Sequence, residues 1–573
     1  MKRKNAIATI CFLLSGSAGL IYEVCWIRSA SLVFGSTSYA LSAILAVFFL
    51  GISLGSYLFG RISQRIDRPL RLFALMEVAV AVLALASPLA FQVLDSLYGM
   101  AYRAIGEQFA LLMLARIGLV CVVLLPPTVL MGGTLPLFCR QFVDEESRIA
   151  RSVGLLYGVN TLGAAIGCAA TGLVLLPALG MFGSICVGAS LDLAVALATG
   201  FLGLRAQPSP KTEKKENRIL PTTNHVAVSA LLFLTGFVAL GNEVLWTRHL
   251  ALLLRNTVYT YTLTLTAVLL GIVLGSAVAG LHFDRAKSRG FWFGSLQAAI
   301  GLVTLGLMLI PAGFWYRFEP LPLTTYFLLL VPPAVLSGAA FPLGIRMVLD
   351  DPAFAGVSVG KLSALNTVGG IAGSLTVGFV LLPLLGQQST LLFTTGLSLA
   401  GGLVAWIMLD RNFPATLRWS ATLTSLIVWL VLPIASGTRL PADFLVNNKK
   451  GDRLIAHREG LSSNLAVIQR PWGTRVLEIN RLWQGQDVKN HQIVAAHVPM
   501  LLRSDPHSVL LVGAGAGQTA SRFLMYSIDR LDCVDIEPAV FDVIRKYFPS
   551  DWMNDRRVRL LREDGRNYIA HAR

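Results

Sequence analysis

The chain has 573 residues, of which 54% are hydrophobic and only 14% are charged, and its formal net charge is +16. This is the composition of a membrane protein and not of a soluble domain. Most basic residues stand in short loops between apolar runs, which indicates orientation in a membrane and argues against nucleic-acid binding. The seven cysteines show no metal-ligand spacing, so we expect no metal site.

Two sets of six apolar runs come first along the chain. Each run is long enough to cover a hydrocarbon core of ~30 Å at ~1.5 Å per residue. The first set falls within 1–204, a polar linker covers 205–221, and the second set falls within 222–410. A weaker thirteenth run at 419–436 lies within 411–437. The sequence therefore predicts a polytopic helical membrane domain with 12 or 13 spans.

The two sets are copies of each other. The match keeps a constant offset of 220 in the early runs and of 206 in the later ones. Matched positions are Glu23, Trp26 and Arg28 with Glu243, Trp246 and Arg248, and Asn160 and Gly167 with Asn366 and Gly373. An even number of spans per copy gives both copies the same direction, a parallel repeat. In this respect the membrane half resembles the major facilitator transporters.

Basic residues gather in alternate loops, beginning with Lys2-Arg3-Lys4. We expect that side to be cytoplasmic, with the N-terminus inside and the chain spanning the cytoplasmic membrane several times. Twelve spans return the chain to the same side, whereas a thirteenth at 419–436 would place the C-terminal part of the chain on the opposite side. Both topologies stay open on the sequence.

Ionisable residues occur within the predicted spans. Glu23 and Glu243 lie near mid-span, each five residues before an arginine, Arg28 and Arg248. One interpretation is that each Glu–Arg pair neutralises itself as a membrane ion pair and joins two helices. The other is that the carboxylates lie on a transport pathway or a proton relay. Duplication is compatible with both interpretations.

After about residue 438 the composition becomes that of a soluble domain. We expect a small β subdomain with a connecting helix at 438–505 and a partial Rossmann-like domain at 506–573. A strand at 508–512 leads into a loop that contains Gly513, Gly515 and Gly517. The glycines let the backbone approach a ligand, and Asp535 ends the next strand, where an acidic side chain can accept both hydroxyls of a ribose. The pattern predicts a nucleoside site.

The segment from about 453 to 573 resembles the polyamine aminopropyltransferases, the spermidine synthases. The motifs that carry the likeness are the run 477–484, the segment 491–499, the glycine loop, Val534-Asp535-Ile536-Glu537 and Asp564-Gly565. The resemblance implies that Gln484 contacts the nucleoside and that Asp564 contacts the adenine. It also implies a donor substrate, decarboxylated S-adenosylmethionine or a related adenosyl compound, with no tightly bound cofactor. The whole chain resembles bacterial fusions of a major-facilitator-like membrane domain with such a domain.

The chain departs from the family on the amine side of the site. The acidic residue of the glycine loop is Ala516 here, the aromatic residue of the amine pocket is His491, and the first motif has Asn480-Arg481 in place of Asp-Gly. The catalytic aspartate of the family lies beyond Arg573, so no catalytic residue is assigned. His491 and His497 are expected either to line the amine site or to have a structural role, and either could act as a base.

Without a further strand, strand 508–512 would present an unpaired apolar edge. We therefore expect that the chain is a C-terminally truncated reading frame, or that a second copy or another chain completes the sheet. Three functions stay open: membrane-bound aminopropyl transfer, a carrier of polyamine or another small solute with a regulatory or degenerate adenosyl domain, and a membrane scaffold with a decayed enzyme domain. The expected partners are the lipid bilayer, a small amine and an adenosyl ligand, and not nucleic acid.

Overall fold

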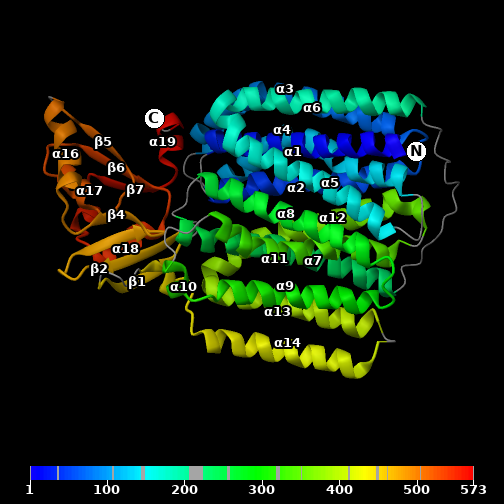
Figure 1. Ribbon diagram of the computed structural model, residues 1–573. Coiled ribbons are helices and arrows are strands. Elements are labelled where there is room, and N and C mark those ends of the chain that lie inside the picture. The colour runs from blue at the N-terminus through cyan, green and yellow to red at the C-terminus, as the bar shows by residue number, and fades with distance from the viewer. Residues whose placement is uncertain are drawn as a thin grey trace.

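The computed structural model describes residues 2–34, 38–105, 109–143, 149–205, 223–254, 258–317, 323–349, 351–410, 413–446, 451–460, 463–503 and 505–571. Long helices lie side by side in one half, and an α/β domain covers one end of them (Figure 1). The fold class expected from the sequence, a polytopic helical domain followed by an α/β domain with a small β subdomain, is confirmed.

The first six-helix set comprises α1 (Lys2–Phe34), α2 (Ser38–Ser63), α3 (Pro69–Ile105), α4 (Phe109–Phe142), α5 (Ile149–Ala170) and α6 (Leu176–Arg205). The second comprises α7 (Thr223–Leu254), α8 (Val258–His282), α9 (Arg289–Met308), α11 (Leu323–Val348), α12 (Ala355–Thr376) and α13 (Leu382–Met408), with the short helix α10 (Ala312–Tyr316) after α9 and the short 3₁₀ turn η3 (Pro352–Phe354) before α12. Within the described residues, eleven helical stretches are long and apolar enough to cross a membrane. The chain is thus a multi-pass membrane protein.

The two sets pack in the same way. In the first, α1 packs on α5, α2 on α4 and α3 on α6; in the second, α7 packs on α12, α8 on α11 and α9 on α13. A hydrogen bond also recurs at equivalent places: Ser15 Oγ donates to Glu77 Oε1 over 2.8 Å, and Gln297 donates to Thr235 Oγ1. The later set thus has a neutral amide where the earlier one has a carboxylate.

Each set is interrupted at the same point by a π-helical turn followed by a glycine. The π turns are η2 (Thr171–Leu175) and η4 (Val377–Leu381). Gly180 and Gly386 follow them with φ of 68° and 76°, a conformation that side chains disfavour. The sequence predicts separate runs here, and the structure joins them without a loop, so two of the eleven stretches, 56 and 57 residues long, each contain two crossings.

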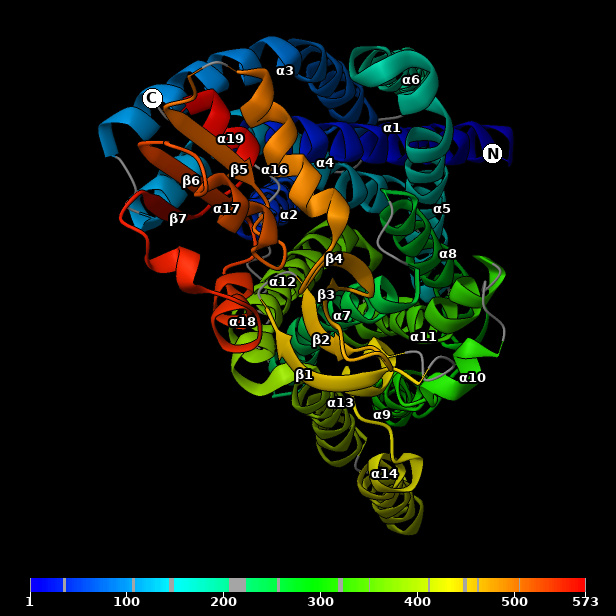
Figure 2. The ribbon, with the colours of Figure 1, turned by 90° about the vertical axis from the view of Figure 1, so that its left-hand side faces the viewer.

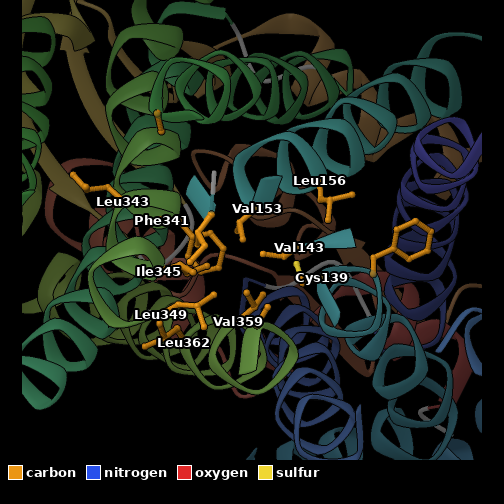
Figure 3. Close-up of a cluster of buried hydrophobic side chains, with 14 of the residues drawn as sticks. Cys139, Val143, Val153, Leu156, Phe341, Leu343, Ile345, Leu349, Val359 and Leu362 are labelled. Carbon is orange, nitrogen blue, oxygen red and sulfur yellow. The ribbon is translucent and has the colours of Figure 1, made fainter. Parts of the chain in front are cut away.

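A buried apolar cluster joins the two sets. Side chains of α4, α5, α11 and α12 meet in it, as Figure 3 shows for Cys139, Val153, Phe341 and Val359. Because all four are buried, this contact removes apolar surface of both copies from solvent and lipid. The cluster holds the two copies together at their interface.

Helix α14 (Ala415–Ser436) follows the second set and lies beside α9 and α13. It is continuous through Pro433. Only 6% of its apolar 18-residue stretch is buried, as is typical of a helix that faces lipid. Because the stretches that precede it make an even number of crossings, α14 carries the chain to the end of the bundle opposite the N-terminus (Figure 1).

The small β subdomain is an antiparallel meander in the order β1-β2-β3-β4. Its strands are β1 (Arg453–Glu459), β2 (Asn464–Gln469), β3 (Arg475–Ile479) and β4 (Leu482–Gln486), preceded by α15 (Ala442–Leu445). The runs 465–469 and 474–480, on the two sides of Pro471-Trp472-Gly473, predict the hairpin of β2 and β3, and the structure adds β1 and β4 on its two sides. Side chains alternate between the faces of a strand, and β2 uses both: Ala466 and Ile468 pack on the membrane helices, whereas Leu465 and Val467 pack on the α/β core.

The Rossmann-like part contains a parallel sheet in the order β5-β6-β7. Its elements are α16 (Asn490–Leu502), β5 (Ser508–Val512), α17 (Gln518–Phe523), β6 (Arg530–Asp535), α18 (Ala539–Tyr547), η6 (Asp551–Asn554), β7 (Val558–Arg562) and α19 (Gly565–His571). In the described part of the chain β5 is an edge strand, and its Leu510 and Val512 are 40% and 55% exposed.

Side chains from both halves join the α/β domain to the end of the bundle. Figure 2 shows the ribbon from that end. The Arg481 guanidinium lies 4.6 Å from the centre of the Tyr316 ring and donates to the Leu252 carbonyl oxygen over 3.2 Å. Tyr102 Oη donates to Glu563 Oε2 over 2.6 Å. The basic loops lie at the other end, where Arg140 donates to the Ala353 carbonyl oxygen.

Candidate functional site

The loop after β5 takes its shape from three glycines. Gly513, Gly515 and Gly517 have φ of 88°, 54° and 81°, which favour residues without a side chain. Two of them also pass close to neighbours: a Cβ at Gly515 would lie 2.8 Å from the Gln484 carbonyl oxygen, and one at Gly517 would lie 2.6 Å from Trp552 Nε1. The loop is therefore held between β4 and η6.

Asp535, the last residue of β6, holds this loop from below. Its Oδ2 accepts a hydrogen bond from the Ala514 amide over 2.8 Å, and its Oδ1 accepts one from the Glu537 amide over 2.9 Å. Burial raises the pKa of the Asp535 carboxyl above its ordinary value, and the two backbone amides oppose that rise. A carboxylate can accept about four hydrogen bonds, so ribose hydroxyls can still bind to it.

The β subdomain contributes Gln484 to the same place. Gln484 is half-buried in β4, and its neighbour Gly485 lies so close to Ala516 that a Cβ there would be 2.6 Å from the Ala516 amide nitrogen. Ala516 is itself 3% exposed, so the residue that replaces the acidic side chain of the family is packed against β4. The structure thus brings Gln484 and the glycine loop together.

Asp564 lies after β7, at the same edge of the sheet. Its Oδ1 accepts hydrogen bonds from the backbone amides of Arg566, over 2.9 Å, and Asn567, over 3.3 Å, and so caps α19. Gly565 packs directly against Val512, the last residue of β5. The carboxyl ends of parallel strands form the ligand edge of such sheets, and Asp535, Asp564 and the glycine loop all lie there.

Buried polar atoms without a partner among the described residues surround this edge. Trp552 Nε1, Gln518 Nε2 and Asn567 Nδ2 are buried and make no hydrogen bond within that part of the chain. Unpaired buried donors cost about 1–3 kcal/mol each, so their presence beside a glycine loop fits a ligand with acceptor atoms, such as a nucleoside. The residues present therefore fit the adenosyl half of the predicted donor.

The two histidines of the predicted amine side have other contacts. His491 is exposed, and its ring lies 4.9 Å from the ring of Trp483. His497 Nδ1 is 2.7 Å from Tyr526 Oη, within hydrogen-bonding distance. Among the described residues, no group of three or more His, Cys, Asp or Glu side chains that could hold a metal is found.

The ligand edge of the sheet faces the membrane half. Glu563, the residue after β7, binds Tyr102 of α3. Glu537, just after β6, accepts a hydrogen bond from Ser463 Oγ over 3.0 Å and packs on Gly460, whose carbonyl oxygen in turn accepts one from Arg248 of α7. The candidate nucleoside site is thus joined to the end of the bundle through short contacts.

A cavity of about 520 Å³ lies within the membrane half, and both intramembrane glutamates line it. Glu23 and Glu243 are close enough to interact electrostatically there. Arg248 also lines the cavity, whereas Arg28 is exposed. Within the described residues neither Glu23 with Arg28 nor Glu243 with Arg248 forms an ion pair, and both carboxyl side chains line the same cavity instead.

Two further polar residues of the cavity were not predicted from the sequence. Asn242 and Thr304 line it, are 5% and 0% exposed, and have side-chain oxygens, Oδ1 and Oγ1, with no hydrogen-bond partner in the described chain. Asn242 stands at the offset of 220 from Tyr22, so the repeat gives no matching amide to draw attention to it. Thr304 carries no charge and follows no motif.

Known proteins resemble parts of this chain. A family profile described as "Spermine/spermidine synthase domain" matches residues 489–573. Polyamine aminopropyltransferase 2 of Streptomyces coelicolor is 26% identical over 376 residues, which cover 60% of this chain and 65% of that protein. This alignment is longer than the α/β domain, so it extends into the membrane half. The polyamine aminopropyltransferase of Clostridium beijerinckii is 40% identical over 76 residues, which cover 13% of this chain and 27% of that protein.

Two solved structures are also similar. A spermidine synthase in complex with the transition-state analogue AdoDATO matches 20% of this chain and 43% of that chain, at 24% identity and a TM-score of 0.20. The human organic anion transporter MFSD10 matches 70% of this chain and 99% of that chain, at 16% identity and a TM-score of 0.46. The chain thus spans less than two thirds of the curated relatives and less than half of the solved spermidine synthase. It carries a spermidine synthase domain at its C-terminus.

Proposed function

We propose that the C-terminal domain binds the adenosyl part of decarboxylated S-adenosylmethionine, or of a related adenosyl compound, and serves membrane-bound aminopropyl transfer to an amine. The observation that carries the proposal is the Asp535 carboxylate, which two backbone amides hold at the end of β6, under the glycine loop. An acidic side chain there can accept the ribose hydroxyls. The family match over 489–573 supports the same assignment.

In this reaction the amine lone pair forms a bond to the carbon next to the sulfonium, and the carbon–sulfur bond breaks. The electron pair leaves with sulfur as a neutral thioether, and the amine proton passes to a general base. Because the thioether leaves readily, positioning and one base are sufficient. The described residues supply the nucleoside side through Asp535, Gln484 and Asp564. We assign no base, because His497 is engaged by Tyr526 and His491 is exposed.

Equilibrium binding of methylthioadenosine and of decarboxylated S-adenosylmethionine to the full-length protein in lipid nanodiscs tests the proposal. We expect saturable binding that Asp535→Ala weakens by tenfold or more, about 1.4 kcal/mol. Asp555→Ala is the matched control, because the Asp555 carboxylate pairs with Arg557 and, among the described residues, accepts no hydrogen bond from the glycine loop. Absence of binding, or equal affinity of Asp535→Ala and wild type, would reject the proposal.

A second function is favoured by Arg248. This residue lines the membrane cavity and also binds Gly460 of the α/β domain. We infer a carrier for a small solute whose cavity communicates with a regulatory adenosyl domain. Its test is uptake into proteoliposomes with and without methylthioadenosine on each side. Uptake that does not respond to the nucleoside would remove the regulatory role.

A further inference from the structure

The membrane cavity has an unusual distribution of charge. Glu23 of α1 and Glu243 of α7 occupy matching places in the two copies, and both line the one cavity. Neither carboxylate has a hydrogen bond or an ion pair from the described residues. An ionised carboxylate away from water is costly unless a cation compensates it. Within the described chain, the cavity therefore presents two carboxylates from opposite copies with no cation of the protein bound to them.

Arg248 does not neutralise them. Its Nη2 donates to the Gly460 carbonyl oxygen, and the charges that act on its guanidinium most are those of Glu459 and Glu537, in the α/β domain. The guanidinium thus lies at the end of the cavity toward that domain and is directed outward. Arg28, the corresponding residue in the first copy, is exposed.

The rest of the lining narrows the class of ligand. Asn242 and Thr304 line the cavity, and their side-chain oxygens, Oδ1 and Oγ1, are buried without a partner among the described residues. Two acceptor atoms besides the carboxylates thus lack a donor there. The remaining walls are largely apolar, as at Phe49, Leu240 and Phe341. About 520 Å³ is far more than a bare metal ion occupies and is within the range for small organic ligands.

We propose that this cavity is a binding site for an aliphatic amine cation, whose ammonium groups pair with Glu23 and Glu243 while its methylene chain packs on the apolar walls. Asn242 Oδ1 and Thr304 Oγ1 accept hydrogen bonds from the same ammonium groups. An ammonium group carries three donors and no acceptor, which matches a site whose unsatisfied atoms include acceptors. The inference rests on the second function proposed above, since it names what the cavity takes, and it does not require an active adenosyl domain.

Binding of radiolabelled spermidine to the full-length protein in nanodiscs tests this site. We expect saturable binding, and a loss of affinity of roughly tenfold or more in both Glu23→Gln and Glu243→Gln. Glu77→Gln is the control. Glu77 is also buried in the membrane half but binds Ser15 and does not line the cavity, and the second copy naturally has Gln297 at the matching position. The affinity of Glu77→Gln for spermidine should equal that of the wild type.

Folding of each variant is checked by its melting temperature, which should stay near that of Glu77→Gln. Three outcomes would overturn the site: no saturable spermidine binding by the wild type, unchanged affinity in both cavity variants, or displacement by an equal concentration of sodium chloride, which would indicate an inorganic cation. Loss of spermidine binding in Asp535→Ala alone would place the amine in the α/β domain. Methylthioadenosine binding is measured on the same samples, so failure of the nucleoside site is distinguished from failure of the cavity.

Discussion

The guanidinium of Arg248, in the membrane half, donates a hydrogen bond to the backbone carbonyl oxygen of Gly460, in the α/β domain. From Gly460 the contacts continue inward: its amide donates to the Ser463 carbonyl oxygen over 2.8 Å, and Ser463 Oγ donates to Glu537 Oε2 over 3.0 Å. The Glu537 amide then donates to Asp535, which holds the glycine loop. One series of hydrogen bonds thus connects the membrane cavity with the candidate nucleoside site.

Arg248→Met should loosen this junction. A hydrogen bond from a charged donor contributes about 1.5–3 kcal/mol, so local opening around β1 and β2 should become easier by up to that amount. Hydrogen exchange of peptides covering 453–469 in the full-length protein measures the change. Arg28→Met is the control, because Arg28 is the repeat counterpart of Arg248 and is exposed. Equal protection in both variants would show that the Arg248 contact does not stabilise the junction.

Nucleoside affinity should depend on the protonation of Asp535. Burial raises the pKa of this carboxyl above its ordinary value of about 3.9, so its protonated form persists to a higher pH than in an exposed aspartate. Ribose hydroxyls donate to the ionised form, and methylthioadenosine affinity should therefore fall as the pH drops through the raised pKa and level off above it. The binding constant, measured from about pH 4 to pH 8, checks this.

The same group acts on stability with the opposite sign. A carboxyl whose folded-state pKa is raised binds more protons when folded than when unfolded, so it lowers stability above the unfolded pKa, and this loss disappears as the pH falls through the raised value. In Asp535→Asn both pH dependences should be absent. A pH-independent affinity in the wild type would contradict a role of the ionised carboxylate in binding.

Gly517→Ala should disturb the loop more than Gly513→Ala. Both glycines have positive φ, which costs roughly 1–2 kcal/mol for a residue with a Cβ. At Gly517 the added methyl group would also meet Trp552. At Gly513 an added methyl group would have no described atom within 4 Å, apart from its chain neighbours. Overpacking adds about 1–3 kcal/mol. Hydrogen exchange of the loop peptides separates the two, and equal destabilisation would show that Trp552 gives way.

Local patterns predicted the strand at 508–512 and the strand that ends at Asp535, because each depends on nearby residues, whereas β1 and β4 were not predicted. Asp535 ends its strand 22 residues after Gly513, and that spacing alone places the carboxylate beneath the loop. The contact of Arg248 with Gly460 could not be foreseen, since it joins residues 212 positions apart in different domains. The spacing of Glu243 and Arg248 suggested an ion pair, but Arg248 binds the α/β domain instead.

Topology is the expectation that the structure sharpens most. The run at 419–436 contains a proline and several hydroxyl side chains, so composition alone leaves two topologies open. In the structure α14 is continuous and ends on the side of the α/β domain, opposite the basic loops. Positive residues favour the cytoplasmic side, so we predict that the α/β domain and its site lie on the other side of the membrane.

Alkaline phosphatase fused after Gly451 should therefore be active, and the same fusion after Lys287, in the basic loop between α8 and α9, should be inactive. Green fluorescent protein at the two points should show the reverse. Activity at neither point would mean that α14 does not cross the membrane. Activity at Lys287 alone would mean that the whole chain has the opposite orientation in the membrane. If the prediction holds, adenosyl donor and amine must meet outside the cytoplasm. Adenosyl donors are scarce there. The cavity, together with Arg248 at the same face of the membrane, would then be the more important candidate for a route by which substrate passes between the compartments.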